Sequence, residues 1–147
     1  AGVGEELVAI EQYVARYGLG ESVRITGTLT RESLGMLMSG GDCFVFPSRH
    51  DTFGLIAQEA LCTGMPVISS NTTALDEWID DGMGLKVDPD DVDQIAEAMV
   101  ELAENPDRFD GKAIRDRVVE RFGIAAFGER MKEQYQQVIS ECAELRE

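Results

Sequence analysis

Lysine and arginine are scarce in this sequence. Its 147 residues include 13 Lys and Arg against 28 Asp and Glu, which gives a formal net charge of −15 at pH 7. A field of that sign repels phosphate backbones and anionic lipid headgroups. The composition therefore argues against nucleic acid as a partner. The acidic excess also fits adaptation to salt, an interpretation that composition alone leaves open.

Cysteine is sparse too, and the sequence has no long hydrophobic run. Cys43, Cys62 and Cys142 show no metal-ligand spacing, and the first two lie in apolar stretches where a reduced thiol packs as a small hydrophobe. This pattern indicates a reducing, cytoplasmic setting. No segment approaches the roughly 18 continuous apolar residues of a membrane span, so we expect no direct membrane insertion, although a longer parent protein can be peripheral at a membrane.

An initial Met and a signal peptide are missing as well. The sequence opens at Ala1 with neither a basic n-region nor an apolar h-region. We therefore expect the chain to be a piece of a longer protein. Its length provides material for one domain with one hydrophobic core, which we expect over residues 1–147.

Short apolar runs alternate with helical patterns along the first half of the chain. Leu7, Ile10, Val14 and Tyr17 follow helical spacing up to Gly18, which is typical of a helix C-terminus. Further elements are expected as a strand over 23–26, a helix around Leu34 and Leu37, a strand over 43–48 buried on both faces, a helix over 55–61 closed by Gly64, and a strand over 66–70.

The second half contains one more strand candidate and several helices. Thr73 and Asp76 fit a capping box ahead of a short helix through Trp78 and Ile79, and we expect Trp78 to be buried rather than stacked on a base. The remaining elements are expected as a strand over 84–87, a helix from Asp88 with Ile95, Met99 and Leu102 turned inward, a helix after Asn105-Pro106 to Phe122, and a long helix over 124–145. This alternation predicts an α/β fold with a Rossmann-like, doubly wound parallel sheet.

The segment "HDTFGLIAQEA", residues 50–60, lies where a strand is expected to turn into a helix. In open α/β sheets ligands bind beyond the carboxyl ends of the strands, and the unpaired N–H groups of a helix N-terminus can hold a diphosphate. Gly54 would let the ligand come close. Glu59 lies about 7.5 Å further along the helix and leans back toward its start, within reach of ribose hydroxyls.

Asp51 lies on the loop before that helix, on the opposite side of the expected diphosphate. Together with Glu59 it would bracket a nucleotide linked to a sugar. A glycosidase pair is disfavoured, because such carboxylates face each other across one bond and nothing here supplies the second face. The alternative is structural: Asp51 as a solvated loop acid or helix N-cap, and Glu59 as an exposed helix position.

The stretches "FVFPSRHDTFGLIAQEALCTGMPVISS" and "ALDEWIDDGMGLKVDPDD" resemble the C-terminal half of the group 1, family-four glycosyltransferases of the GT-B fold. The resemblance covers nearly the whole chain and includes the family's pattern of two acids separated by seven residues. It implies retaining transfer of a sugar, of the hexosyltransferase type, from a nucleotide-sugar donor, with neither a metal nor another cofactor. It also implies donor binding by the backbone of Phe53, Gly54 and Leu55, ribose binding by Glu59 and a catalytic contact of Asp51 with the donor sugar.

The sequence departs from the family pattern in three places. The first acid is usually Glu, so Asp51 is one methylene shorter, and the segment "DGMG" over 81–84 is one residue tighter than usual. The family also places an Arg, a Lys and an acceptor-binding N-terminal domain upstream of the position of Ala1. The resemblance thus implies a domain incomplete at its N-terminal strands, which we expect to be inactive by itself.

Several neighbouring residues are further candidates for donor binding. Arg49 and His50 precede the motif and Thr52 lies within it; Arg49 would substitute for the upstream cations, while a surface Arg and a solvated His are the simpler interpretations. Gly27 and Thr28 follow the first expected strand at the edge where the family seats the base. Thr73 opens a helix at the same sheet edge, where capping alone would explain it.

The apolar stripe of the helix over 124–145 has two interpretations. Packing in the core is the default, and docking on the absent N-terminal domain is what the family resemblance suggests. Two other functions stay open as alternatives. One is a further GT-B enzyme, such as a nucleotide-sugar 2-epimerase. The other is an acidic receiver-like signalling domain, which would need a phosphorylatable Asp at the end of a strand where this sequence has Pro47-Ser48.

Overall fold

The computed structural model describes residues 2–72 and 74–144 of the chain. Two compact units follow one another, Ala1–Leu37 and Met38–Glu147, and each is described by itself. Helix α2 (Arg31–Ser39) runs across the boundary between them. The sequence predicts a helix around Leu34 and Leu37, and α2 contains both residues.

The first unit contains helix α1 (Leu7–Arg16), which ends at the predicted position. Gly18 follows with a φ of +65°, a conformation that glycine adopts at little cost. The strand expected over 23–26 is wrong, since those residues have no regular secondary structure. A strand needs a neighbour to pair with, whereas the Val23 N–H donates to the Leu19 carbonyl in a local turn, at 2.8 Å, and the Gly2 N–H donates to the Gly27 carbonyl just beyond the segment, at 2.6 Å.

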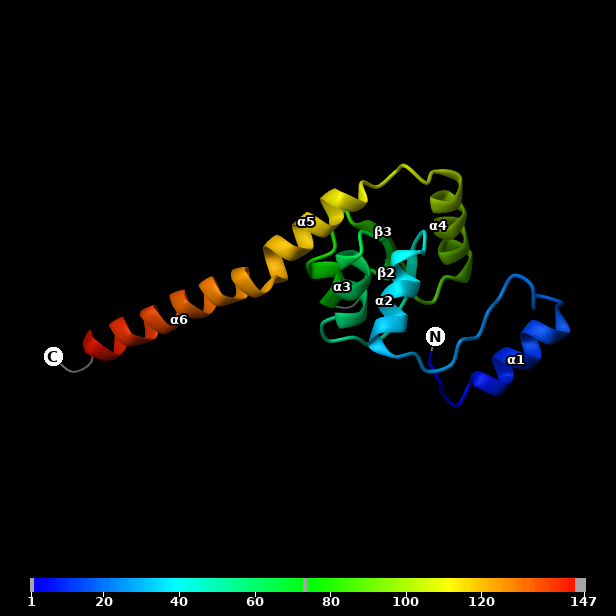
Figure 1. Cartoon of the computed structure of the whole chain (residues 1–147), viewed down its shortest axis with the longest axis horizontal. Helices are drawn as coiled ribbons and strands as arrows, with labels where there is room; N and C mark the ends of the chain where they lie inside the picture. Colours follow the sequence, from blue (N-terminus) through cyan, green and yellow to red (C-terminus); the bar gives the residue numbers. More distant parts are fainter. Residues whose placement is uncertain (1, 73, 145–147) are drawn as a thin grey trace. The chain divides into compact units, whose positions relative to one another are not determined.

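The second unit is built on a parallel sheet, with the strands in the order β1-β2-β3. The strands are β1 (Phe44–Phe46), β2 (Val67–Ser70) and β3 (Gly84–Val87). Figure 1 labels β2 and β3 of this sheet. β2 is buried along its length, whereas β1 pairs only with β2 and is half-buried. The predicted strand over 43–48 is therefore too long, and it is not buried on both faces as expected.

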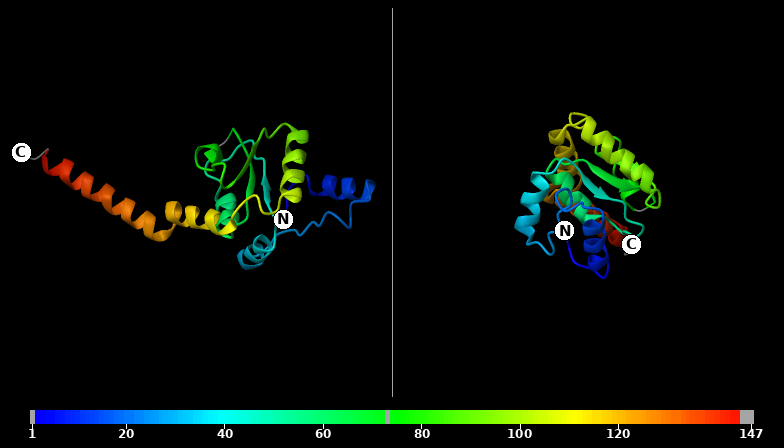
Figure 2. Two further views of the ribbon diagram at one scale, coloured as in Figure 1. Left: turned by 90° about the horizontal axis from the view of Figure 1, so that it is seen from above. Right: turned by 90° about the vertical axis from the view of Figure 1, so that its right-hand side faces the viewer.

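Helices follow the strands as the alternating pattern predicts. They are α3 (Leu55–Cys62), the 3₁₀ turn η1 (Ala74–Glu77), α4 (Val92–Glu104), α5 (Gly111–Phe122) and α6 (Ile124–Glu144). Helices α3 and α4 pack on the sheet, and α5 packs on α3 (Figure 2). Ile68 and Val87 of the sheet form a core cluster with Ala98 and Leu102 of α4. This arrangement confirms the predicted α/β fold with a parallel sheet.

The start of α4 lies later than the sequence indicates. Asp91, rather than Asp88, caps the helix, because its side chain accepts a hydrogen bond from the Gln94 N–H at 2.9 Å. Along the helix, Ala98 and Leu102 are buried and Ile95 packs against the core, whereas Met99 is 46% exposed. The prediction that Met99 faces inward is therefore wrong.

Two glycines bring the end of α3 against the start of α5. Gly64 has a φ of +90°, and a Cβ added to it would lie 2.8 Å from the carbonyl oxygen of Gly111. The reverse holds for Gly111 and the Gly64 oxygen, also at 2.8 Å. The two backbones thus pack with no side chain between them, next to the fully buried Ile114 and Val118 of α5.

The apolar residues of α6 are exposed, which contradicts the expectation that they pack in the core. Ile124 is 93% exposed, Tyr135 63% and Ile139 68%. Among residues 2–72 and 74–144, no helix is long and apolar enough to cross a membrane.

Candidate functional site

A shallow depression of about 500 Å³ lies at the carboxyl ends of β1 and β2. Because the two strands are parallel neighbours, the loops that follow them meet at one edge of the sheet. The residues that line it are Arg49, His50, Asp51, Thr52, Thr72 and Ala74. Four residues predicted from the motif are thus brought together, and Thr72 joins them from the loop after β2.

Asp51 is half-buried and holds the loop that leads into α3. Its Oδ1 accepts a hydrogen bond from the Phe53 N–H at 2.8 Å and another from the Gly54 N–H. An Asx-type turn of this kind satisfies backbone donors just before the helix. The N-cap residue of α3 is Gly54, so Oδ1 holds the loop just before the helix, and two of the backbone groups expected to meet the diphosphate are engaged with this carboxylate.

Gly54 is buried and adopts a left-handed conformation, with a φ of +73°, directly before Leu55, the first residue of α3. A Cβ at this position would overlap Cδ2 of Leu75, which lies in η1. Close packing against Leu75 thus requires glycine here. No local pattern indicates this contact, because it depends on a residue 21 positions away.

Phe53 is fixed by an aromatic cluster. Its carbonyl accepts a hydrogen bond from the Trp78 indole N–H at 3.3 Å. Both Phe53 and Trp78 pack edge-to-face on Phe122 at the end of α5, with ring centroids 5.9 Å and 5.2 Å away. The predicted burial of Trp78 is confirmed, since 6% of it is exposed. The cluster determines the path of the loop and was not foreseen from the sequence.

Arg49 connects the loop after β1 with the loop after β3. Its Nε lies 2.6 Å from Oδ1 of Asp90, and both side chains are about two-thirds exposed, at 66% and 69%. His50 is exposed, and its carbonyl accepts a hydrogen bond from the Ser48 hydroxyl at 3.1 Å. The cation expected to assist the diphosphate therefore already has a carboxylate partner.

Glu59 lies half-buried on the second turn of α3 and is not among the described residues that line the depression. The pKa of the Cys62 thiol is raised, mainly by burial. The charge of Arg115 lowers this pKa, and the charge of Glu59 raises it. The electrostatic effect of Glu59 therefore reaches the side of α3 that carries Cys62. Its expected contact with ribose stays a prediction.

Gly27, Thr28 and Thr73 are the other residues predicted to bind the donor. Gly27 and Thr28 belong to the first unit, where Gly27 has a φ of +63°. Thr73 lies outside the described residues. Over residues 2–72 and 74–144, no three His, Cys, Asp or Glu side chains are grouped so that they could hold a metal ion.

Comparison with known families gives a match over most of the chain. The sequence profile of the family described as "Glycosyl transferases group 1" matches residues 1–105. The chain is 24% identical over 147 residues to the alpha-D-kanosaminyltransferase of Streptomyces kanamyceticus, which covers 94% of this chain and 36% of that protein. It is 42% identical over 74 residues to the O-antigen chain mannosyltransferase B of Escherichia coli, over 50% of this chain and 19% of that protein.

Solved structures share the fold. The sucrose-phosphate synthase of Thermosynechococcus elongatus is 34% identical, with a TM-score of 0.79 over 94% of this chain and 35% of that one. Anabaena HepE in complex with UDP is 20% identical, with a TM-score of 0.80 over 92% of this chain and 39% of that one. The chain thus spans little more than a third of the length of the proteins that it matches over most of its own length.

Proposed function

The chain belongs to the group 1 glycosyl transferases, and we propose that it forms the part of such an enzyme that binds the nucleotide-sugar donor. The observation that carries the proposal is the depression that Arg49, His50, Asp51 and Thr52 line beside the N-terminus of α3. The whole enzyme would transfer a sugar with retention of anomeric configuration, without a metal. Its acceptor would bind to a second domain.

The diphosphate is assigned to the start of α3. The first N–H groups of an α-helix lack partners within the helix, and its dipole is positive at this end. Asp51 Oδ1 already accepts hydrogen bonds from the Phe53 and Gly54 N–H groups. The phosphate oxygens would therefore accept hydrogen bonds from the N–H groups of Leu55 and Ile56. Arg49 and His50 would face the same phosphates from the loop after β1.

Asp51 is assigned to the donor sugar through its second oxygen. Oδ1 anchors the loop, so Oδ2 would accept a hydrogen bond from a sugar hydroxyl. In the reaction, the bond between the anomeric carbon and the diphosphate oxygen breaks as the acceptor oxygen bonds to that carbon. The acceptor's proton leaves to a phosphate oxygen, and the N–H groups at α3 stabilise the charge on the departing diphosphate.

Two further assignments come from the family resemblance. Glu59 would bind the ribose hydroxyls, with Gly27, Thr28 and Thr73 near the nucleoside. The exposed apolar face of α6 would dock on the acceptor-binding domain, which fits the 57% and 54% exposure of Phe127 and Val138. We expect such an enzyme to work in the cytoplasm. A receiver-like function finds no support, because β1 is followed by Pro47-Ser48 instead of an acidic residue.

Calorimetric titration of the chain with UDP, GDP and ADP tests the proposal. We expect one diphosphate to bind weakly and Glu59→Ala to weaken that binding, whereas Glu97→Ala, an exposed glutamate on α4, leaves it unchanged. Equal affinities of the wild-type chain and Glu59→Ala would contradict the ribose assignment. Transfer of radiolabelled sugar by the 147-residue chain alone would contradict the expectation that it is inactive by itself. Product analysis with the longer protein would separate transfer from 2-epimerisation.

A further inference from the structure

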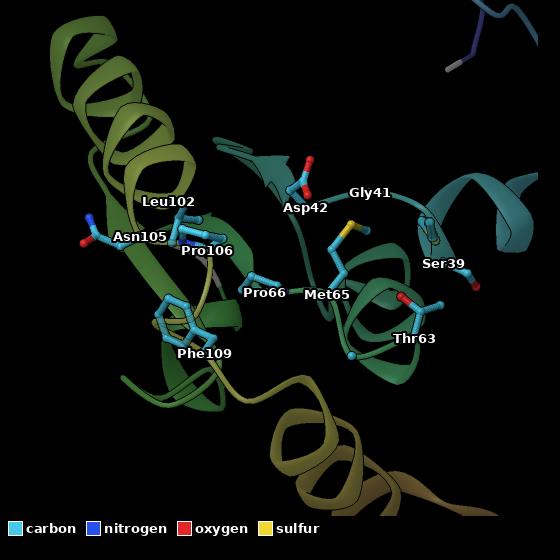
Figure 3. Close-up of a pocket in the computed structure, with 12 residues that line it drawn as sticks. Ser39, Gly41, Asp42, Thr63, Met65, Pro66, Leu102, Asn105, Pro106 and Phe109 are labelled. Atoms are coloured by element: carbon cyan, nitrogen blue, oxygen red, sulfur yellow. The ribbon is translucent and has the colours of Figure 1, made fainter.

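A second pocket, of about 210 Å³, lies at the opposite edge of the sheet from the proposed donor site (Figure 3). Asp42 and Pro66 line it just before β1 and β2 begin, and Leu102 and Asn105 line it at the end of α4. It is smaller than the roughly 300–1,000 Å³ of sites for drug-sized ligands. A ligand held here is therefore a small one.

The floor of this amino-edge pocket is apolar. Met38 and Met65 are each 5% exposed and Leu102 is 6% exposed, and Phe109 contributes a half-buried ring. Figure 3 shows Asp42 and Met65 on one side of the opening, with Leu102 and Phe109 on the other. Methionine side chains adapt to ligands of irregular shape and favour contact with aromatic groups.

The rim of the same pocket carries negative charge. The helices run opposite to the strands in this fold, so the C-termini of α3, at Cys62, and α4, at Glu104, lie at this edge. A helix C-terminus acts like about half a negative charge. The carbonyls of Ala60 and Leu61 in α3 already accept hydrogen bonds from residues 63–65, and that of Glu101 in α4 accepts from Asn105, so the dipoles rather than free carbonyls supply this charge. The carboxylate of exposed Asp42 adds a full charge, within the field of a chain whose net charge is −15.

Arg108 and Arg115 lie near the pocket, but neither is among the described residues that line it; the charge of Arg115 reaches the end of α3, where it lowers the pKa of the Cys62 thiol. Arg108 pairs with Glu101 and lies over the outer part of the Phe109 ring, 5.4 Å from its centroid, but it does not line the pocket. Its position shows that the ring accepts a planar cation by a cation–π contact.

We propose that the amino-edge pocket binds a small organic cation, an amidinium, guanidinium or ammonium group attached to a compact apolar body. The apolar part packs on Met38, Met65, Leu102 and Phe109, and the cationic group faces Asp42 and the negative ends of the α3 and α4 dipoles. The site differs from the donor site in both position and charge, so it does not depend on the proposed transferase function.

Titration of the ¹⁵N-labelled chain with benzamidine tests this inference, with the Gly41 and Gly64 amide resonances as reporters because both residues line the pocket. We expect saturable shifts with a dissociation constant on the order of 1 mM. Benzamide has nearly the same shape but no charge, and should bind at least about fivefold more weakly.

Two variants separate a specific site from general attraction to an acidic surface. Asp42→Asn should weaken benzamidine binding about threefold to fivefold, whereas Glu133→Gln, the same loss of charge at an exposed position on α6, should leave it unchanged. Equal binding of benzamide, an equal loss in both variants, or no shift at Gly41 and Gly64 at roughly ten times the expected dissociation constant would each overturn the proposal.

Discussion

Arg49 and Asp90 form an ion pair across the carboxyl edge of the sheet, with Nε 2.6 Å from Oδ1. The pair joins the loop after β1 to the loop after β3, and Asp90 is itself held by a hydrogen bond from its N–H to Asp88 Oδ1 at 2.9 Å. Arg49 also lines the proposed donor site. If the diphosphate binds as proposed, Asp90 and the diphosphate compete for the same guanidinium group.

This competition predicts that Asp90→Asn tightens binding of the nucleoside diphosphate. Exposed ion pairs contribute about 0.2–1 kcal/mol, so the gain should be up to about fivefold, and affinity for the nucleoside alone should not change. Calorimetry with both ligands measures the difference. Asp93→Asn, in the first turn of α4, is the matched control. The idea fails if the gain persists when Arg49 is also replaced by Gln.

Asp51→Ala should destabilise the second unit by about 0.5–2 kcal/mol, because the Phe53 and Gly54 N–H groups lose the oxygen that accepts from them. Asp51→Asn keeps an acceptor oxygen and should lose less. Urea unfolding of both variants measures the difference. If Asp51→Asn is as unstable as Asp51→Ala, the carboxylate acts through its charge at the helix end rather than as the acceptor of these two hydrogen bonds.

Gly54→Ala should destabilise the chain by about 2–4 kcal/mol, because a left-handed backbone and an overlap with Leu75 add their costs. Gly128→Ala is the control, since Gly128 lies inside α6 with nothing within 4 Å of an added Cβ. That change should instead stabilise the helix by about 0.5–1 kcal/mol. A loss of similar size in both variants, measured by chemical unfolding, would contradict the packing argument.

Raising the salt concentration should stabilise the chain, because its charge of −15 destabilises the compact state by self-repulsion. Ions screen this repulsion, whereas the exposed ion pairs that they also weaken contribute little. Thermal unfolding in increasing KCl should therefore show a rising Tm. The same series in sucrose controls for excluded-volume effects, and a Tm that falls with KCl would contradict the prediction.

Elements whose stability comes from their own residues were predictable from the sequence. The strand over 84–87 and the helix over 55–61 were placed closely because apolar runs end there at glycine or at a polar turn. The start of α4 was missed because two acids, Asp88 and Asp91, both suit an N-cap. The strand expected over 23–26 was wrong because pairing needs a neighbour, which the local pattern cannot reveal.

The candidate site was predictable in its residues but not in its contacts. Arg49, His50, Asp51 and Thr52 line a depression at the sheet edge where the motif predicts a site, and their roles stay predictions. The sequence did not reveal that Asp51 binds the backbone of its own loop, or that the Phe53 carbonyl meets the Trp78 indole. Both contacts depend on the exact path of a loop, which residue types alone do not determine.

The contact between Gly64 and Gly111 affects how the proposed donor site can move. One end of α3 would hold the diphosphate, and the other end touches α5 backbone to backbone, with no side chain between them that could change its rotamer to absorb a displacement. The two helices are therefore mechanically coupled. A shift of α3 on donor binding would be transmitted as a rigid-body motion to α5 and, through Gly123, to α6.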